Sequence, residues 1–182
     1  MTREEELRKR IIEYGKRLVE EGLIQSTWGN ISARVSEEHF LITPSGVDYY
    51  KIKPEDIVKV RIDDLSYEGD VKPSSEKRMH GLIYRKRKDI GGIVHTHSSN
   101  LQVFASCREP LVKEGKVIYP CSRYGVSGTR RLAELVAREF ANHAGVIIAN
   151  HGFIAGGEDL DSAFALAVAA EKEAGEMLED AR

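Results

Sequence analysis

Two histidines separated by one residue, His95 and His97, close the apolar segment IVHTHS at residues 93–98. In a β-strand, residues i and i+2 point to the same side, so the two imidazoles lie together while Thr96 points away. Neighbouring imidazoles at a strand end are natural joint ligands for a divalent metal. The pair alone does not decide between a metal site and two histidines hydrogen-bonded at a sheet edge.

A third histidine, His151, directly follows the apolar segment GVIIAN. We expect this segment to be a strand and Gly152 to allow a tight turn, so that all three histidines converge from strand ends of one sheet. Three neutral imidazoles and one open position make a catalytic zinc site. The sequence therefore predicts a metal site of His95, His97 and His151, although His151 alone would be interpreted as a loop residue.

The segment KPSSE, residues 72–76, lies where a helix is expected to begin. Backbone N–H groups and the positive end of the helix dipole at such a start, with the hydroxyls of Ser74 and Ser75, suit a phosphate. Glu76 adds a carboxylate to the same turn, whereas plain helix capping is the alternative. His80 lies four residues further on and could face the same way, but we interpret it as structural because the other histidines already supply ligands. The turns TWGN (27–30) and TPSG (43–46) are weaker candidates for anion binding.

Short strands and helices alternate without a regular βαβ rhythm, which predicts α/β layering with a sheet that need not be parallel. Expected helices cover residues 3–21, 73–89, 98–106, 129–143 and 159–180, and expected strands cover residues 30–35, 39–43, 57–62, 90–97, 116–120 and 145–150. At 182 residues, without a linker or repeat, the chain is expected to be one domain, 1–182.

Composition excludes several classes of protein. The chain is 41% hydrophobic and 31% charged with a net charge of -2, so no basic surface indicates nucleic-acid binding. No apolar run is long enough for a membrane span, and the charged amphipathic start is unlike a signal peptide, so we expect a cytoplasmic protein.

Taken in order, STWGNISARV, LITPSG, KPSSE, IVHTHS, Gly128–Thr129 and NHG are similar to the class II aldolase/adducin family, over about residues 5–178. The resemblance implies a three-layer α/β/α domain with a largely antiparallel central sheet. It also implies a homotetramer with active sites at subunit interfaces, and one Zn²⁺ per chain. The implied reaction is reversible cleavage of a ketose 1-phosphate, of the fuculose-1-phosphate type, to dihydroxyacetone phosphate and an aldehyde.

By this resemblance the metal ligands are His95, His97, His151 and Glu76, and Glu76 is also the catalytic base. The phosphate-binding positions are those matching Asn30, Ser45, Gly46, Ser74 and Ser75. The fuculose-phosphate aldolases carry a longer segment after the histidine strand, which includes a proton-donating tyrosine. This chain has only CREPLVKEGKVI there, so Tyr119 and Tyr124 are candidate substitutes, and Ser127 stands where the family has an aromatic residue.

Other activities of the family remain as alternatives. Sugar-phosphate 4-epimerases tend to carry Asp at the position of Glu76. Methylthioribulose-phosphate dehydratases use a separate glutamate, for which Glu109 and Glu114 are poor local matches. Adducin-like binding modules have lost the metal-binding residues, which are all present here.

Overall fold

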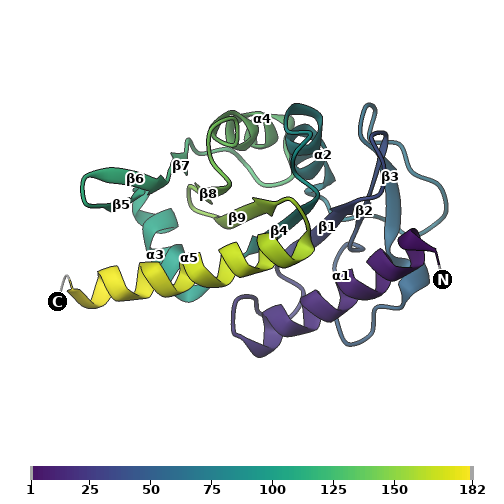
Figure 1. The fold of residues 1–182 in the computed structure, drawn as a ribbon, viewed down its shortest axis with the longest axis horizontal. Coiled ribbons are helices and arrows are strands. Elements are labelled where there is room, and N and C mark those ends of the chain that lie inside the picture. The colour runs from purple at the N-terminus through teal and green to yellow at the C-terminus, as the bar shows by residue number, and fades with distance from the viewer. Residues whose placement is uncertain (1, 181–182) are drawn as a thin grey trace.

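The central feature of the chain is a seven-stranded sheet with the strand order β3-β2-β1-β4-β9-β8-β7, seen in a computed structural model that describes residues 2–180 (Figure 1). All neighbouring strands are antiparallel except β7 and β8. The strands are β1 (Asn30–Arg34), β2 (His39–Ile42), β3 (Val58–Arg61), β4 (Gly92–Thr96), β7 (Cys121–Ser122), β8 (Gly145–Ile148) and β9 (Gly152–Gly157). A separate hairpin pairs β5 (Leu111–Lys113) with β6 (Lys116–Tyr119).

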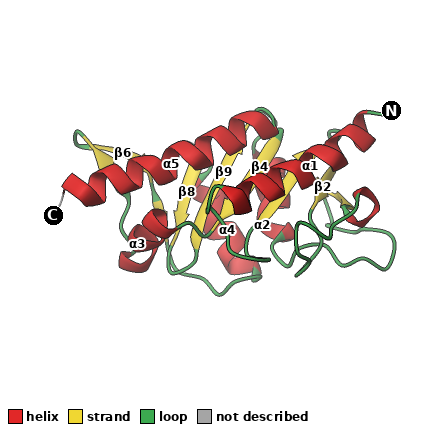
Figure 2. Ribbon diagram, turned by 90° about the horizontal axis from the view of Figure 1, so that it is seen from below, coloured by secondary structure: helices red, strands yellow, loops and turns green. Residues whose placement is uncertain are grey.

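Helices cover both faces of the sheet. They are α1 (Arg3–Glu20), α2 (Lys77–Lys86), α3 (Ser99–Cys107), α4 (Arg130–Glu139) and α5 (Leu160–Asp180), with one 3-10 turn, η1 (Pro54–Asp56). Figure 2 shows α1 and α5 lying across one face, while α2 and α4 pack together on the other. The expected three-layer α/β/α arrangement with a largely antiparallel sheet is confirmed.

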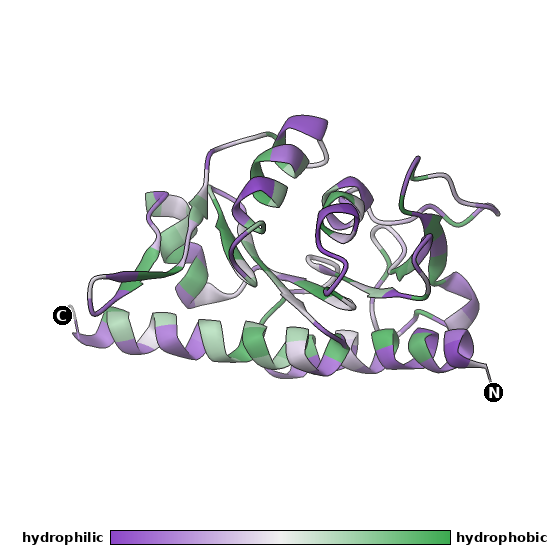
Figure 3. Cartoon of the chain, turned by 45° about the horizontal axis from the view of Figure 1, so that its top comes forward, coloured by the Kyte–Doolittle hydropathy of each residue, from purple (hydrophilic) through white to green (hydrophobic). Residues whose placement is uncertain are grey.

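Each face of the sheet has its own apolar core, because successive strand residues point to opposite sides. In β4, Ile93 packs into the core under α2 and α4, whereas Val94 packs into the core under α1, α3 and α5. The helices carry hydrophobic stripes toward the sheet and polar residues on their outer sides, which gives the mixed colours of Figure 3. None of the helices in the described residues is long and apolar enough to cross a bilayer.

The structure corrects the expected elements in two places. The second helix begins at Lys77 instead of Pro73, because the serines form a turn before it. The glycine-rich segment GFIAGG, for which no strand was expected, is strand β9. The strand expected at residues 116–120 is present as β6 and belongs to the side hairpin. Glycine is required in β9 at Gly157, where an added Cβ would lie 2.5 Å from the backbone nitrogen of Ala163 in α5.

Candidate active site

A cavity of about 880 Å³ opens at one end of the central strands, where β1 begins, β4 ends and the β8–β9 turn lies. Its walls include all the residues expected to bind phosphate, together with Glu76, His97 and His151, although these lie far apart along the chain. The lining residues used below are Trp28, Asn30, Ser45, Gly46, Ser74, Ser75, Glu76, His97, Ser127 and His151.

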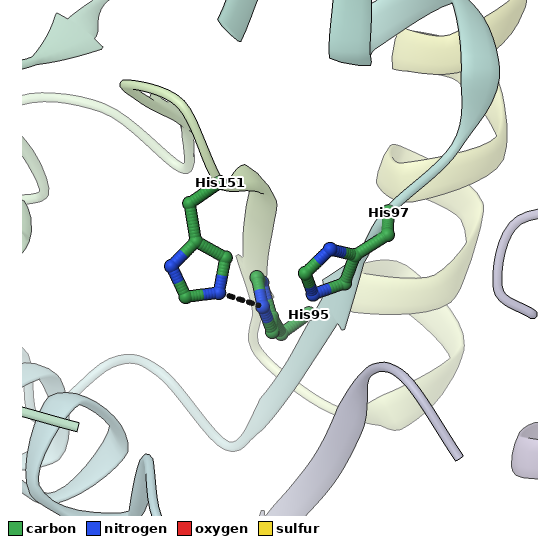
Figure 4. Close-up of side chains that lie close together, drawn as sticks. All are labelled: His95, His97 and His151. Carbon is green, nitrogen blue, oxygen red and sulfur yellow. Dashed lines mark hydrogen bonds between the residues drawn. The ribbon is translucent and has the colours of Figure 1, made fainter. Parts of the chain in front are cut away.

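The three histidines converge at the base of this cavity, as predicted (Figure 4). His95 Nε2 and His151 Nε2 lie 3.2 Å apart, and one ring nitrogen of each of the three histidines lies within 4.8 Å of the others. Any separation longer than 3.2 Å in this set therefore involves His97. These three residues form a site for a divalent metal ion.

Local backbone geometry positions His151 in the three-residue turn between β8 and β9. The turn is made by Asn150, which adopts the left-handed conformation with φ 56°, a region that Asn tolerates better than most residues. Gly152 has a different role from the one expected, since it makes room for β4. A Cβ at Gly152 would lie 2.3 Å from the backbone oxygen of Thr96 and 3.4 Å from the His95 ring.

Hydrogen bonding fixes the tautomer of His95. Its Nδ1 lies 2.8 Å from the carbonyl oxygen of Phe153 in β9, which can only accept, so the Nδ1–H donates. The other ring nitrogen, Nε2, must then present a lone pair toward Glu76 and His151. Such a carbonyl partner behind a histidine is the usual support of a metal ligand.

Glu76 brings its carboxylate to the same point. Oε2 lies 3.1 Å from His95 Nε2, and Oε1 lies 3.2 Å from His151 Nε2. Ligand atoms about 2.0–2.2 Å from a tetrahedral zinc are separated by roughly 3.3–3.6 Å. The observed distances from Glu76 to the two histidines are close to the ligand–ligand distances of such a tetrahedral site. Lone pairs this close to one another favour a cation between them. The donor set therefore fits a divalent metal.

The charge state of these groups also suits a metal. Burial opposes ionisation of Glu76, but His95 and His151, together with a hydrogen bond from Asn30, lower the pKa of Glu76 from 4.5 to about 2. Burial lowers the pKa of His95 well below its usual range, and burial with repulsion from His151 lowers the pKa of His97 to about 4. At neutral pH the site therefore offers an ionised carboxylate and imidazoles free to bind a metal through their lone pairs.

Two further polar side chains hold Glu76. Asn30 Nδ2 donates to Oε2 at 3.1 Å, and Ser127 Oγ donates to Oε1 at 3.1 Å. The contact from Asn30 follows from the register of β1 and β4, which pairs Asn30 directly with His95. Sequence reasoning missed the contact from Ser127, and its only signal was the absence of the aromatic residue of the family at this position.

The residues expected to bind phosphate line the wall beside Glu76. A bridge between Pro44 and Pro73, with a hydrogen bond from the Ser74 N–H to the oxygen of Thr43 (3.0 Å), holds the TPSG and KPSSE turns together. Ser75 is exposed to the cavity, whereas Ser74 is buried and accepts a hydrogen bond from the Glu76 N–H at 3.2 Å.

Three other candidate residues lie outside the cavity wall. His80 is fully buried under the site and contacts Asn30, in agreement with a structural interpretation. Tyr119 is buried in the core, where its ring packs on Phe153 at 5.2 Å between centroids. Tyr124 is 52% exposed and stacks near Arg108. Neither tyrosine is among the residues lining the cavity of a single chain.

Comparison with known proteins agrees with this geometry. The family described as Class II Aldolase and Adducin N-terminal domain matches residues 9–178. The 5-deoxy-D-ribulose 1-phosphate aldolase of Bacillus thuringiensis serovar kurstaki is 40% identical over 167 residues, which cover 88% of this chain and 78% of that protein. The L-fuculose phosphate aldolase of Haemophilus influenzae is 33% identical over 169 residues, covering 89% of this chain and 77% of that protein.

Solved structures give the same result. An L-fuculose 1-phosphate aldolase superposes with a TM-score of 0.90 at 35% identity, covering 96% of this chain and 86% of the other. The L-fuculose-1-phosphate aldolase of Thermus thermophilus superposes with a TM-score of 0.77 at 28% identity, covering 96% of this chain and 94% of the other. With its buried three-histidine site, the chain therefore belongs to the class II aldolase/adducin family and is a metal-dependent aldolase of that family.

Proposed function

We propose that the protein is a zinc-dependent aldolase that reversibly cleaves a ketose 1-phosphate to dihydroxyacetone phosphate and an aldehyde. The observation that carries this proposal is the position of Glu76. Its carboxylate lies 3.1 and 3.2 Å from the facing nitrogens of His95 and His151, at the base of a cavity with polar, hydroxyl-rich walls.

In this proposal His95, His97, His151 and Glu76 hold one Zn²⁺ per chain, because nitrogen and carboxylate ligands in a four-coordinate set suit zinc. When bound, the ion supplies Lewis-acid polarisation of the substrate carbonyl, which favours electron density moving onto that oxygen. The protein then has no need of a lysine that forms a Schiff base.

Glu76 is the proposed base. In the synthetic direction its carboxylate takes a proton from the hydroxymethyl carbon of dihydroxyacetone phosphate, that carbon attacks the aldehyde, and the aldehyde oxygen takes a proton from solvent. In the cleavage direction the C4 hydroxyl loses its proton to solvent and becomes the aldehyde oxygen. The C3–C4 bond breaks, its electron pair moves toward the C2 carbonyl, and the protonated Glu76 gives a proton to C3. The hydrogen bonds from Asn30 and Ser127 hold the carboxylate in place for this transfer.

The phosphate of the substrate is proposed to bind at Asn30, Ser45, Gly46, Ser74 and Ser75, which share one wall of the cavity. Anchoring the phosphate fixes the three-carbon unit against Glu76 and supplies orientation. The aldehyde part is proposed to be short and deoxygenated at its end, because the similar proteins act, by their names, on 5-deoxyribulose 1-phosphate and on fuculose phosphate. The two ketose 1-phosphates would release acetaldehyde and lactaldehyde respectively.

The dehydratase alternative is less well supported. It calls for a second carboxylate beside the substrate, and neither Glu109 nor Glu114 lines the cavity of the described chain. A binding module without activity would have no need of the buried metal-binding residues.

We further propose a homotetramer with the sites at subunit interfaces, in the cytoplasm. A large apolar side chain in the cavity wall supports an interface there, since Trp28 is 62% exposed.

Hydrogen exchange into dihydroxyacetone phosphate tests the proposal directly. An aldolase of this kind must remove the hydroxymethyl proton before an aldehyde arrives, so the zinc-loaded protein in D₂O should exchange one hydrogen stereospecifically, as NMR would show. A zinc-loaded wild-type protein without exchange would reject the aldolase and favour the dehydratase.

Glu76→Gln is the matched variant, because it keeps the size of the side chain but removes the base. It should lower the exchange rate by at least about 10²-fold. Zinc content is measured alongside, since the substitution also changes a proposed ligand. Retention of the wild-type exchange rate in Glu76→Gln would exclude Glu76 as the base.

A further inference from the structure

A continuous line of polar side chains leads from Glu76 into the core between α2 and the sheet. Asn30 Oδ1 lies 2.6 Å from His80 Nε2, His80 Nδ1 lies 2.6 Å from Ser32 Oγ, and Ser32 Oγ lies 2.8 Å from the Tyr84 hydroxyl. His80, Ser32 and Tyr84 are 0% exposed, and Asn30 and Glu76 are 6% exposed. So many polar groups in an apolar core are stable only when every one is paired.

The spacing of residues along α2 and β1 brings these polar side chains together. Glu76, His80 and Tyr84 are spaced at i, i+4 and i+8 along one face of α2 and its first turn. Asn30 and Ser32 are spaced at i and i+2 on the side of β1 that faces this helix. The polar residues of α2 therefore lie directly opposite the polar residues of β1.

The direction of each hydrogen bond is fixed by chemistry. The ionised Glu76 carboxylate can only accept, so Asn30 must present its amide nitrogen to it, and the Asn30 oxygen must face His80. That oxygen can only accept, so His80 Nε2 carries the proton. In a neutral ring Nδ1 then accepts from the Ser32 hydroxyl, which in turn accepts from Tyr84. In each of these four hydrogen bonds, the donor lies on the side away from Glu76 and the acceptor on the side toward it.

We infer that His80 is a positioning residue for the aldolase reaction, because its Nε2–H holds the Asn30 amide with the nitrogen, and not the oxygen, toward Glu76. This inference rests on the proposed role of Glu76 as base. Without the His80 donor, the buried Asn30 oxygen would lose its partner, and the amide would no longer be held from both ends in the position that donates to the carboxylate. The same hydrogen bond from His80 leaves the second N–H of the Asn30 amide to donate to the substrate phosphate that is expected at this wall.

The first test reads the tautomer in the zinc-loaded protein without substrate. Two-dimensional ¹H–¹⁵N spectra of the histidine side chains assign the protonated nitrogen of each ring. We expect His80 as the Nε2–H tautomer, with slow exchange of that proton because the ring is buried. An Nδ1–H tautomer of His80 would overturn the inference, whatever the activity of the protein.

The second test is a double-mutant cycle between His80 and Asn30, read by the dihydroxyacetone phosphate exchange rate per zinc-loaded chain. His80→Phe keeps a planar ring without a donor and should lower the rate about ten-fold, the value of one hydrogen bond to a charged site. His80→Gln, which can donate from the Nε2 position, should restore most of it. In an Asn30→Ala background, His80→Phe should have little further effect.

Equal losses from His80→Phe in both backgrounds, or a His80→Gln variant as slow as His80→Phe, would overturn the inference. Ile83→Ala is the matched control, since Ile83 is a fully buried neighbour on α2 without a polar role. It should lower stability but not the rate per folded chain. If His80→Phe does not fold, the tautomer of His80 and the exchange rate of His80→Gln still test the inference. A wild-type protein without hydrogen exchange would reject the proposed function and not this inference.

Discussion

Ser74 and Ser75 are adjacent in the chain but should respond differently to substitution by alanine. Ser74 is 6% exposed, and its hydroxyl accepts a hydrogen bond from the Glu76 N–H at 3.2 Å. Ser75 is exposed and lines the cavity. Helix capping and phosphate binding were competing interpretations of the KPSSE segment. The N-cap residue of α2 is Glu76, without a side-chain cap hydrogen bond, so Ser74 supports the turn before the helix instead of capping it.

Ser74→Ala removes the acceptor for a buried N–H at the start of α2. Loss of such a buried hydrogen bond costs about 1 kcal/mol of unfolding free energy. For a domain of this size, that corresponds to a Tm lower by about 2–4 °C. Since the same N–H belongs to the proposed base, kcat should fall as well.

Ser75→Ala should leave stability within about 0.5 kcal/mol of the wild type, because the side chain is exposed and caps nothing. If its hydroxyl binds the substrate phosphate, the loss of about 1.5 kcal/mol raises KM for a ketose 1-phosphate roughly ten-fold. The unphosphorylated ketose, which lacks the partner of this hydroxyl, should show no change.

Thermal unfolding and steady-state kinetics with both substrates measure these effects. A Ser75→Ala variant with KM raised equally for the phosphorylated and the unphosphorylated ketose would reject the phosphate assignment. A Ser74→Ala variant with the Tm of the wild type would show that this hydrogen bond contributes nothing to stability.

Three more predictions concern the metal, the buried histidine and the assembly. His97→Ala should lose most of the zinc, measured by elemental analysis, while circular dichroism stays unchanged; equal zinc in both proteins would reject His97 as a ligand. Burial lowers the pKa of His80 from 6.5 to about 4, so the unfolded chain binds this proton first, and stability is lost as pH falls from 6.5 toward 4. Protonation of His80 accounts for up to roughly 3 kcal/mol of this loss in unfolding free energy. Denaturant unfolding of His80→Gln at each pH should not show this contribution. Identical pH profiles of stability for His80→Gln and the wild type would contradict the prediction. Light scattering should give a tetramer, and a 20.4 kDa monomer at micromolar concentration would refute it.

The sequence determined the parts of the site that depend on local geometry. A strand turns successive side chains to opposite faces whatever surrounds it, so the spacing of His95 and His97 was enough to place both imidazoles together. The order of short motifs along the chain was enough for the family, and through it for the layered fold. Strand β9 escaped detection because its glycines serve close contacts with β4 and α5, which are not visible in a hydrophobic pattern.

Only the tertiary structure decided how Glu76 is held. The register that pairs Asn30 with His95 depends on the packing of the whole sheet, and no spacing in the sequence encodes it. The hydrogen bond from Ser127 comes from a loop 51 residues away in the chain, and the His80–Asn30 contact spans 50 residues. Contacts between distant segments arise from the docking of α2 and the loop before α4 onto the sheet. The sequence therefore specified which groups could do the chemistry, and the fold decided which of them touch.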